Sequence, residues 1–198
     1  LSKLINQILD LGKLDAAKLE LHPTTEVFYL LVKRIIGAFD SIAEQEKVEL
    51  ILQFGAPQEL KIKVDTDKFE MVLNNFLSNA IKYTPPGGAV IVDVQKPNQN
   101  IIVSVKDTGR GIHPDDLPHI FDRYYQTAQK NAPAEGGTGI GLALCKEIAK
   151  LFRGKIWAES TLGEGSRFIF EFPAAEVIGR ISNEDAGLLE TASVPSAV

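Results

Sequence analysis

The apolar positions of this chain follow two rhythms, one typical of helices and one typical of strands. Several segments carry apolar residues at every third or fourth position, the spacing that buries one face of a helix. Shorter segments alternate apolar and polar residues, as half-buried strands do. The helical pattern covers residues 1–21, 28–42, 65–83 and 139–152, with a short helix near 117–124. The strand pattern covers residues 48–54, 60–64, 89–95, 101–106, 155–159 and 166–172.

Helices and strands alternate irregularly, and two pairs of strands are joined by short turns. Short turns favour antiparallel pairing, which we expect within 89–106 and within 155–172. This order predicts an α+β fold, a two-layer α/β sandwich in which helices cover one face of a mixed sheet. After Pro173 small and polar residues dominate, so we expect 174–198 to be a linker or tail with a short helix near 186–191.

Local signals set the expected ends of the helices. His22 precedes Pro23 and ends the first helix, because a residue before proline is pushed out of the α region. Thr24 or Thr25 is expected to cap the second helix. Asp65 is a good cap for the helix over 65–83, which the prolines and glycines of 85–88 then stop.

The first helix has a wide apolar face and no capping residue before Leu1. Its face is formed by Leu1, Leu4, Ile8 and Leu11, and it is wider than one short helix can bury. We expect a helix of a dimeric bundle, cut from a longer protein. The alternative is a helix that folds back on its own domain.

Composition excludes several classes of function. The 198 residues carry 21 basic and 26 acidic side chains, a net charge of -5, so no basic footprint for nucleic acid or a membrane surface is expected. No apolar run approaches the roughly 20 residues of a membrane helix, and no signal peptide opens the chain. The single cysteine, Cys145, fits a reducing, cytoplasmic compartment and is expected to fill the core.

Three polar motifs carry candidate chemistry. Asn75, Asn79 and Lys82 share one side of the third helix, opposite its apolar face, and two amide oxygens with an ammonium suit Mg²⁺ and phosphate. Asp107 ends a strand before a Gly-rich turn, where its carboxylate can accept from an exocyclic amine. The glycines of 136–141 precede a helix and can offer N–H groups to phosphate. The alternatives are a solvated helix face, an ordinary turn and a flexible loop.

The motifs together resemble a known family. Residues 75–84, 107–112, 136–142 and 163–166 are similar, in this order, to the N, G1, G2 and G3 boxes of the ATP-binding domain of sensor histidine kinases (HATPase_c). This domain belongs to the superfamily of gyrase B, a heat-shock chaperone and MutL, which shares the Bergerat ATP-binding fold. Residues 120–125 also resemble the F box, and the similarity runs over 60–172. The glycines match neither a Walker A loop nor a dinucleotide loop.

The resemblance implies three regions and a role for each site residue. Residues 1–22 resemble the second helix of a dimerisation and phosphotransfer domain, 23–173 the catalytic domain, and 174–198 a linker or tail. Asn79, helped by Asn75, would bind Mg²⁺, while Lys82 and Arg123 would lie along the phosphates of ATP. Asp107 would accept from the adenine amino group, and 126–136 would form a lid. The other implied nucleotide contacts are Tyr83, Gly109, Gly111, Ile112, Phe121, Gly137, Thr138, Gly139, Ile140, Gly141, Leu142 and Ser166.

Asn75 bears on the reaction. Members of the superfamily that hydrolyse ATP carry a glutamate one helical turn before the Mg²⁺ asparagine, and an amide at this place cannot activate water. We therefore expect phosphoryl transfer to a positioned nucleophile rather than fast hydrolysis. The alternatives are a degenerate nucleotide-binding signalling module and an ATPase of the gyrase or heat-shock chaperone kind, which Asn75 disfavours.

The phosphate acceptor is expected to lie outside this chain. The family's acceptor histidine is followed by an acidic residue and then by a proline, and His22, His113 and His119 do not match this pattern. The implied partners are the parent's own dimerisation and phosphotransfer domain, as a homodimer, and the receiver domain of a response regulator. The resemblance leaves open whether the parent is a hybrid kinase or is anchored in the inner membrane.

Overall fold

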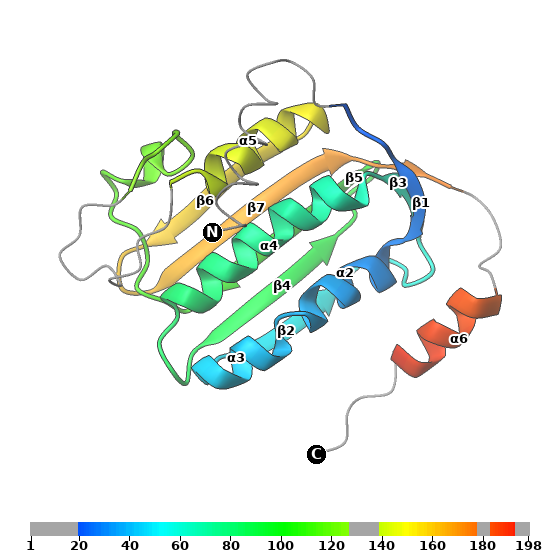
Figure 1. Cartoon of the computed structure of the whole chain (residues 1–198), viewed down its shortest axis with the longest axis horizontal. Coiled ribbons are helices and arrows are strands. Elements are labelled where there is room, and N and C mark those ends of the chain that lie inside the picture. Colours follow the sequence, from blue (N-terminus) through cyan, green and yellow to red (C-terminus); the bar gives the residue numbers. More distant parts are fainter. Residues whose placement is uncertain (1–19, 127–138, 178–182, 193–198) are drawn as a thin grey trace, which may run out of the picture.

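The computed structural model describes residues 20–126, 139–177 and 183–192. The predicted helix over 1–21 therefore lies almost entirely outside the described residues. The described residues form two sheets, one of five strands and one of three, with helices on the larger sheet (Figure 1). The helices are α2 (Phe28–Gly37), α3 (Asp40–Glu46), α4 (Thr66–Tyr83), α5 (Gly141–Leu151) and α6 (Asn183–Ala192). The strands are β1 (Thr24–Val27), β2 (Glu49–Phe54), β3 (Lys61–Val64), β4 (Ala89–Gln95), β5 (Asn100–Asp107), β6 (Lys155–Thr161), β7 (Gly165–Pro173) and β8 (Ala175–Glu176).

The larger sheet is mixed, as expected. Its strand order is β2-β4-β5-β7-β6, in which only β2 and β4 pair in parallel. Both predicted antiparallel pairs, β4 with β5 and β6 with β7, are present. They meet in the middle of the sheet, where β5 pairs with β7 over eight registered positions from Asn100 to Asp107.

The helices cover one face of this sheet, which confirms the predicted two-layer arrangement. Val90, Val92 and Val94 of β4 are fully buried, whereas the alternating Asp93 and Gln95 lie on the other face. In Figure 1 α2, α4 and α5 lie across the same face of the sheet. Between the layers, aromatic rings of helices and strands pack together, at centroid separations of 5.3 to 5.9 Å among Phe28–Phe69, Phe69–Phe172 and Phe76–Phe168. Cys145 is fully buried in this core, as predicted.

The expected cap at Thr24 or Thr25 is wrong. Both residues belong to β1, which pairs antiparallel with β3, and α2 begins only at Phe28 without a side-chain cap. Threonine suits a strand as well as a cap, and the tertiary pairing decides between them. The predicted helix over 28–42 is also interrupted, since α2 ends at Gly37 and α3 starts at Asp40.

The helix that carries the N box begins and ends as predicted. The Asp65 carboxylate accepts a hydrogen bond from the Lys68 N–H at 3.0 Å, and also one from the His22 N–H at 2.8 Å. The Asp65 side chain thus caps α4 and also holds the backbone at His22, just before β1. At the other end the Thr84 hydroxyl donates to the Ala80 carbonyl at 2.7 Å.

Two segments differ in extent from their predictions. The helix expected near 117–124 shrinks to one 3-10 turn, η1 (Leu117–His119). Beyond Pro173, β8 adds an antiparallel strand to β3, and α6 extends the short helix predicted at 186–191. The division of the chain at residue 173 stays a prediction.

Candidate functional site

The helix-covered face of the sheet changes from apolar to polar at one end. Asp107 of β5, Ser166 of β7 and Ser160 of β6 lie directly opposite one another in register. The preceding row on the same face is apolar and contains Val105, Phe168 and Ala158. The apolar layer therefore ends at a row of three polar side chains, next to the point where β5 leads into the G1 segment.

Asp107 is held by backbone N–H groups. It is only 3% exposed, and its Oδ1 accepts from Gly109 N at 2.8 Å and from Ser166 N at 3.3 Å. Burial raises the pKa of Asp107, and these two hydrogen bonds partly oppose the rise. Among the described residues no donor reaches Oδ2, so one oxygen of a fixed carboxylate remains for a ligand.

Glycines allow the G1 segment to lie close to its neighbours. Gly111 has a positive φ of 69°, and a Cβ there would overlap the Thr161 carbonyl. A Cβ at Gly109 would overlap the Tyr83 carbonyl at the end of α4. The segment is thus packed between α4 and the turn that joins β6 to β7.

Arg110, to which sequence reasoning gave no role, lies on the last residue of α4. The centre of its guanidinium is 4.6 Å from the centroid of the Tyr83 ring. The backbone N–H of Arg110 donates to the Tyr83 carbonyl at 3.4 Å. Its Nη1 is buried without a hydrogen-bond partner in the described part of the chain. Lys82 Nζ lies 5.4 Å from the same ring centroid. Two cations therefore flank the ring at this end of the helix.

The N box faces the start of α5. Asn75 Nδ2 donates to the Met71 carbonyl at 2.8 Å, and a Cβ at Gly141 would overlap Asn75 Oδ1. Asn75 and Gly141 are therefore in contact, which joins the N box to the glycines of the G2 box. One turn later on α4, the half-buried Asn79 amide makes no hydrogen bond with the described residues.

The remaining predicted residues fall into three groups. Gly137 and Thr138 lie outside the described residues. Arg123 is exposed in the turn after η1. The apolar residues among the implied nucleotide contacts do not project freely: Ile140 is buried, and Ile112, Phe121 and Leu142 are half-buried against the hydrophobic core.

A backbone hydrogen bond joins the F box to the G2 box. The Tyr124 N–H donates to the Gly139 carbonyl at 2.9 Å. Gly139 has a positive φ of 69°, and a Cβ there would overlap the Tyr124 backbone. The backbones of Tyr124 and Gly139 are therefore in direct contact. The lid predicted over 126–136 lies, except for its first residue, outside the described residues.

Sequence reasoning missed Ser160. Its Oγ accepts from Ile112 N at 2.8 Å, donates to the Gly165 carbonyl at 2.9 Å and lies 2.9 Å from Ser166 Oγ. One hydroxyl therefore joins the G1 and G3 boxes. The available signal was strand alternation, which places Ser160 on the same face as Ile156 and Ala158.

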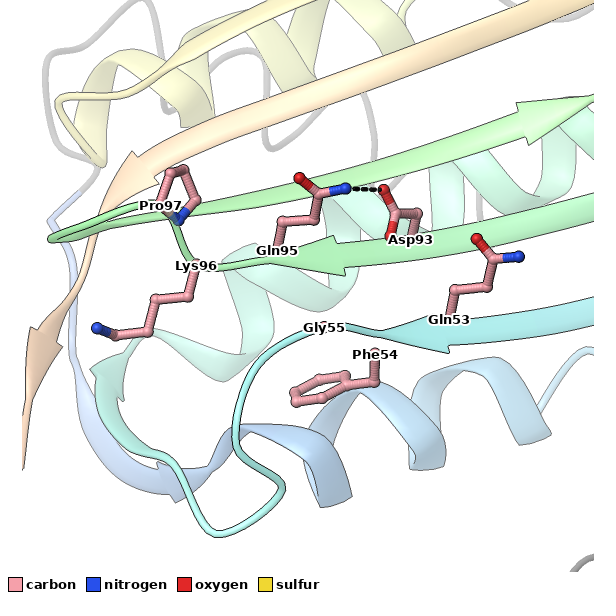
Figure 2. Close-up of a pocket in the computed structure, with 7 residues that line it drawn as sticks. All are labelled: Gln53, Phe54, Gly55, Asp93, Gln95, Lys96 and Pro97. Atoms are coloured by element: carbon pink, nitrogen blue, oxygen red, sulfur yellow. Dashed lines mark hydrogen bonds between the residues drawn. The ribbon is translucent and has the colours of Figure 1, made fainter.

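A pocket of about 520 Å³ lies elsewhere, at the ends of β2 and β4 (Figure 2). Asp93 and Gln95 line it from the face of β4 that turns away from the helices, and Gln95 Nε2 donates to Asp93 Oδ2 at 2.9 Å. None of the boxes contributes to it. The other residues that line it are Gln53, Phe54, Gly55, Lys96 and Pro97.

Comparison with known proteins identifies the family. The sequence model described as "Histidine kinase-, DNA gyrase B-, and HSP90-like ATPase" matches residues 64–176. The chain belongs to this ATPase family. The match contains the N, G1, G2 and G3 boxes, so the resemblance inferred from them is confirmed.

Its curated relatives in this ATPase family include sensor histidine kinases. The chain is 36% identical over 176 residues to the sensor histidine kinase WalK of Bacillus subtilis, a match that covers 88% of this chain and 28% of WalK. It is 30% identical to the sensor protein SrrB of Staphylococcus aureus, over 89% of this chain and 30% of SrrB. The chain thus spans less than a third of these relatives.

Solved structures of histidine kinases share the fold. Full-length ShkA in complex with AMPPNP superposes with a TM-score of 0.80 at 28% identity, covering 89% of this chain and 36% of ShkA. The nucleotide-free catalytic domain of ThkA superposes with a TM-score of 0.67 at 25% identity, covering 77% of this chain and 96% of ThkA. The chain therefore has the fold of a histidine kinase ATP-binding domain. Its described residues include no helix with the length and hydropathy of a membrane span.

Proposed function

We propose that this chain binds Mg·ATP as the catalytic domain of a sensor histidine kinase and donates the γ-phosphate to a histidine outside the chain. The observation that carries the proposal is the layout of α4. Asn75 meets the start of α5, while Tyr83, eight residues later, meets the G1 segment beside Asp107. At 1.5 Å per residue the two ends lie about 12 Å apart, room for a nucleotide along the helix.

At the base end, Asp107 presents an acceptor. Its Oδ1 is occupied by the N–H groups of Gly109 and Ser166, so Oδ2 is the oxygen that would accept from the 6-amino group of adenine. Because the carboxylate is buried, this hydrogen bond competes little with water. Ile112, packed against the core beside it, would shape the wall of the ring pocket.

At the phosphate end, the residues present fit Mg²⁺. Amide oxygens are ligands of the hard oxygen type that this ion takes, and Asn75 Oδ1 is directed at the start of α5 because Nδ2 is engaged by Met71. Asn79 would be the main ligand and Asn75 its helper. When bound, the ion would neutralise charge on the phosphate oxygens. The N-terminus of α5, with Gly141 as its first residue, would offer N–H groups to the same phosphates.

The residue at position 75 favours transfer over hydrolysis. An amide has no basicity with which to activate water, whereas a histidine side chain is itself a good nucleophile. We therefore propose a domain that holds and presents ATP. The phosphate acceptor would be a histidine of the parent's own dimerisation and phosphotransfer domain, and the parent would be a homodimer.

The proposal also includes a second phosphate transfer, from the histidine to a response regulator. WalK is a sensor histidine kinase by name, and a kinase of this kind would pass the phosphate from histidine to an aspartate of a response regulator receiver domain. Such a relay takes place in the cytoplasm, where we propose that this domain lies. Nothing in the net charge of -5 favours nucleic acid as a further partner.

Calorimetric titration of the chain with Mg·ATP tests the binding step. We expect a single site, and a melting temperature that rises with ATP concentration, since a ligand at 100 times its Kd stabilises the fold by about 2.7 kcal/mol. Phosphate alone at the same concentration is the control for general anion effects. Absence of heat and of any melting shift at millimolar Mg·ATP would contradict the proposal.

A further inference from the structure

We infer that Ser160 is a positioning residue that fixes the hydroxyl of Ser166 as a hydrogen-bond acceptor beside Asp107, so that the base site admits 6-amino purines and rejects 6-oxo purines. The inference rests on the proposed function, because it assumes that a nucleotide base lies at Asp107. It concerns a residue outside the set that the family boxes predict.

The geometry begins with the polar row at the end of the sheet. Asp107, Ser166 and Ser160 stand opposite one another on β5, β7 and β6 and project to the same face. Ser166 is the central member: its N–H donates to Asp107 Oδ1, and its Oγ lies 2.9 Å from Ser160 Oγ. It is 8% exposed, so bulk water gives its hydroxyl few other partners.

Counting protons gives the direction of the bond between the two hydroxyls. A serine hydroxyl has one proton to donate and two lone pairs to accept with. Ser160 Oγ donates its proton to the Gly165 carbonyl, which can only accept. One of its two lone pairs accepts from the Ile112 N–H. Its remaining lone pair must therefore receive the proton of Ser166. Ser166 is the donor in the bond between the two serines.

This direction leaves Ser166 without a proton for a ligand. What its Oγ still offers is acceptor capacity, and the ionised Asp107 beside it also only accepts. A base edge that reaches this row, directly or through one water, therefore meets acceptors alone. The 6-amino group of adenine supplies two N–H donors for them. At position 6, hypoxanthine and guanine carry an oxygen, which sets an acceptor against acceptors and leaves the groups that meet position 6 without a donor. The N1–H of these bases lies at the neighbouring position of the edge.

Replacing Ser160 by alanine frees the proton of Ser166. The hydroxyl can then turn and donate to a 6-oxo oxygen, while the Ile112 N–H and the Gly165 carbonyl lose a partner. The first change favours one class of base. The second loosens the G1 segment and weakens every nucleotide alike. Only the ratio of two affinities separates the two effects.

The experiment is calorimetric titration of the full 198-residue chain with Mg·ATP and with Mg·ITP, the 6-oxo analogue. In the natural sequence we expect ATP to bind at least about tenfold more tightly. In Ser160→Ala the ratio of the Kd for ITP to the Kd for ATP should fall by about fivefold, the worth of one hydrogen bond. Ser160→Thr keeps the hydroxyl and should restore the ratio.

Ser104→Ala is the matched control. Ser104 is a serine of the same sheet, buried on β5, and its hydroxyl accepts from Arg167 Nε at 3.1 Å on the face away from the helices. Its loss should lower the melting temperature and leave the ratio unchanged. A Ser160→Ala protein that loses ATP and ITP affinity by the same factor would overturn the inference, because it would show a structural role only.

Ser166→Ala keeps the inference testable if Ser160→Ala does not fold. An acceptor hydroxyl assists ATP and not ITP, so this variant should lose about fivefold in ATP affinity and nothing in ITP affinity. An equal loss for ITP would overturn the inference, because it would show that the Ser166 hydroxyl does not distinguish the two bases. The ATP titration of the natural sequence, run in the same series, reports on the proposed function separately.

Discussion

Asn75 and Gly141 are in direct contact: the amide oxygen of Asn75 occupies the place that a side chain at Gly141 would take. The contact joins the middle of α4 to the first residue of α5. It brings the two boxes that sequence analysis assigned to metal and phosphate to a single point. Glycine at position 141 thus leaves room for the Asn75 side chain, and its φ lies outside the left-handed region.

Gly141→Ala should therefore displace Asn75 and weaken Mg·ATP binding by about tenfold or more, through loss of a positioned metal ligand. Isothermal titration measures the effect. Gly187→Ala in α6 is the matched control, because a Cβ there meets nothing within 4 Å, and it should leave the affinity unchanged. Equal affinity of Gly141→Ala and the natural sequence would show that Asn75 has no part in holding the metal.

Asp107→Asn should separate ligand binding from stability. The new Oδ1 can still accept from the Gly109 and Ser166 N–H groups, but an NH₂ group replaces Oδ2 and opposes the adenine amino group. We expect ATP affinity to fall by about 10- to 100-fold with the fold intact. Circular dichroism checks the fold, and undiminished ATP affinity would contradict the assignment of Asp107 to the base.

The same substitution should change how stability depends on pH. Burial raises the pKa of Asp107, so the folded state holds this proton more tightly than the unfolded state. The free energy of unfolding that this group contributes is present at low pH and is lost as pH rises through the raised pKa. Asp107→Asn removes that loss, so at pH 7 the variant should melt higher than the natural sequence. A lower melting temperature at pH 7 would show that the ionised carboxylate stabilises the fold.

Asn79→Ala should remove the dependence of binding on metal. We expect the natural sequence to bind ATP about tenfold more weakly after EDTA treatment, because the phosphates then lose their bridge to the protein. In the variant, affinities with Mg²⁺ and with EDTA should be equal. The stability should change little, because the amide has no hydrogen-bond partner among the described residues. A full Mg²⁺ effect in Asn79→Ala would place the metal elsewhere.

Arg110→Ala tests the stack at the base end of α4. The guanidinium packs on Tyr83 at 4.6 Å, and its loss should free the ring and weaken ATP binding by about three- to tenfold. Lys33→Ala is a matched control, because Lys33 Nζ lies over the Tyr29 ring at 6.0 Å on another helix, α2. If both variants bind ATP equally, the stack has no role in the site.

Sequence patterns predicted the parts of the fold that local chemistry determines. The cap at Asp65, the stop after Tyr83 and the strands β4 and β5 were expected within a residue of their observed bounds, because each depends on near neighbours. Thr24 and Thr25 were misread because a threonine before a helix and one in an edge strand look alike. Only the pairing with β3, some forty residues away, decides the matter.

The candidate site shows the same division. Asp107 and Asn75 were singled out from their boxes, each of which is a short local pattern. Arg110 and Ser160 were not, because their importance comes from contacts between distant segments: Arg110 with the end of α4, and Ser160 with both G1 and G3. The sequence gives no reason to single out a serine in a strand until the strand register shows which residue it faces on the neighbouring strand.

The central claim, that this chain presents ATP for transfer rather than hydrolysis, is tested most directly by a phosphotransfer assay. The chain is incubated with γ-³²P-labelled Mg·ATP and a separate polypeptide that carries a histidine kinase acceptor helix, and free phosphate is measured alongside. We predict acid-labile label on the acceptor histidine, none when that histidine is replaced, and little free phosphate from the chain alone, because Asn75 cannot activate water. Rapid phosphate release without any labelled histidine would contradict the account.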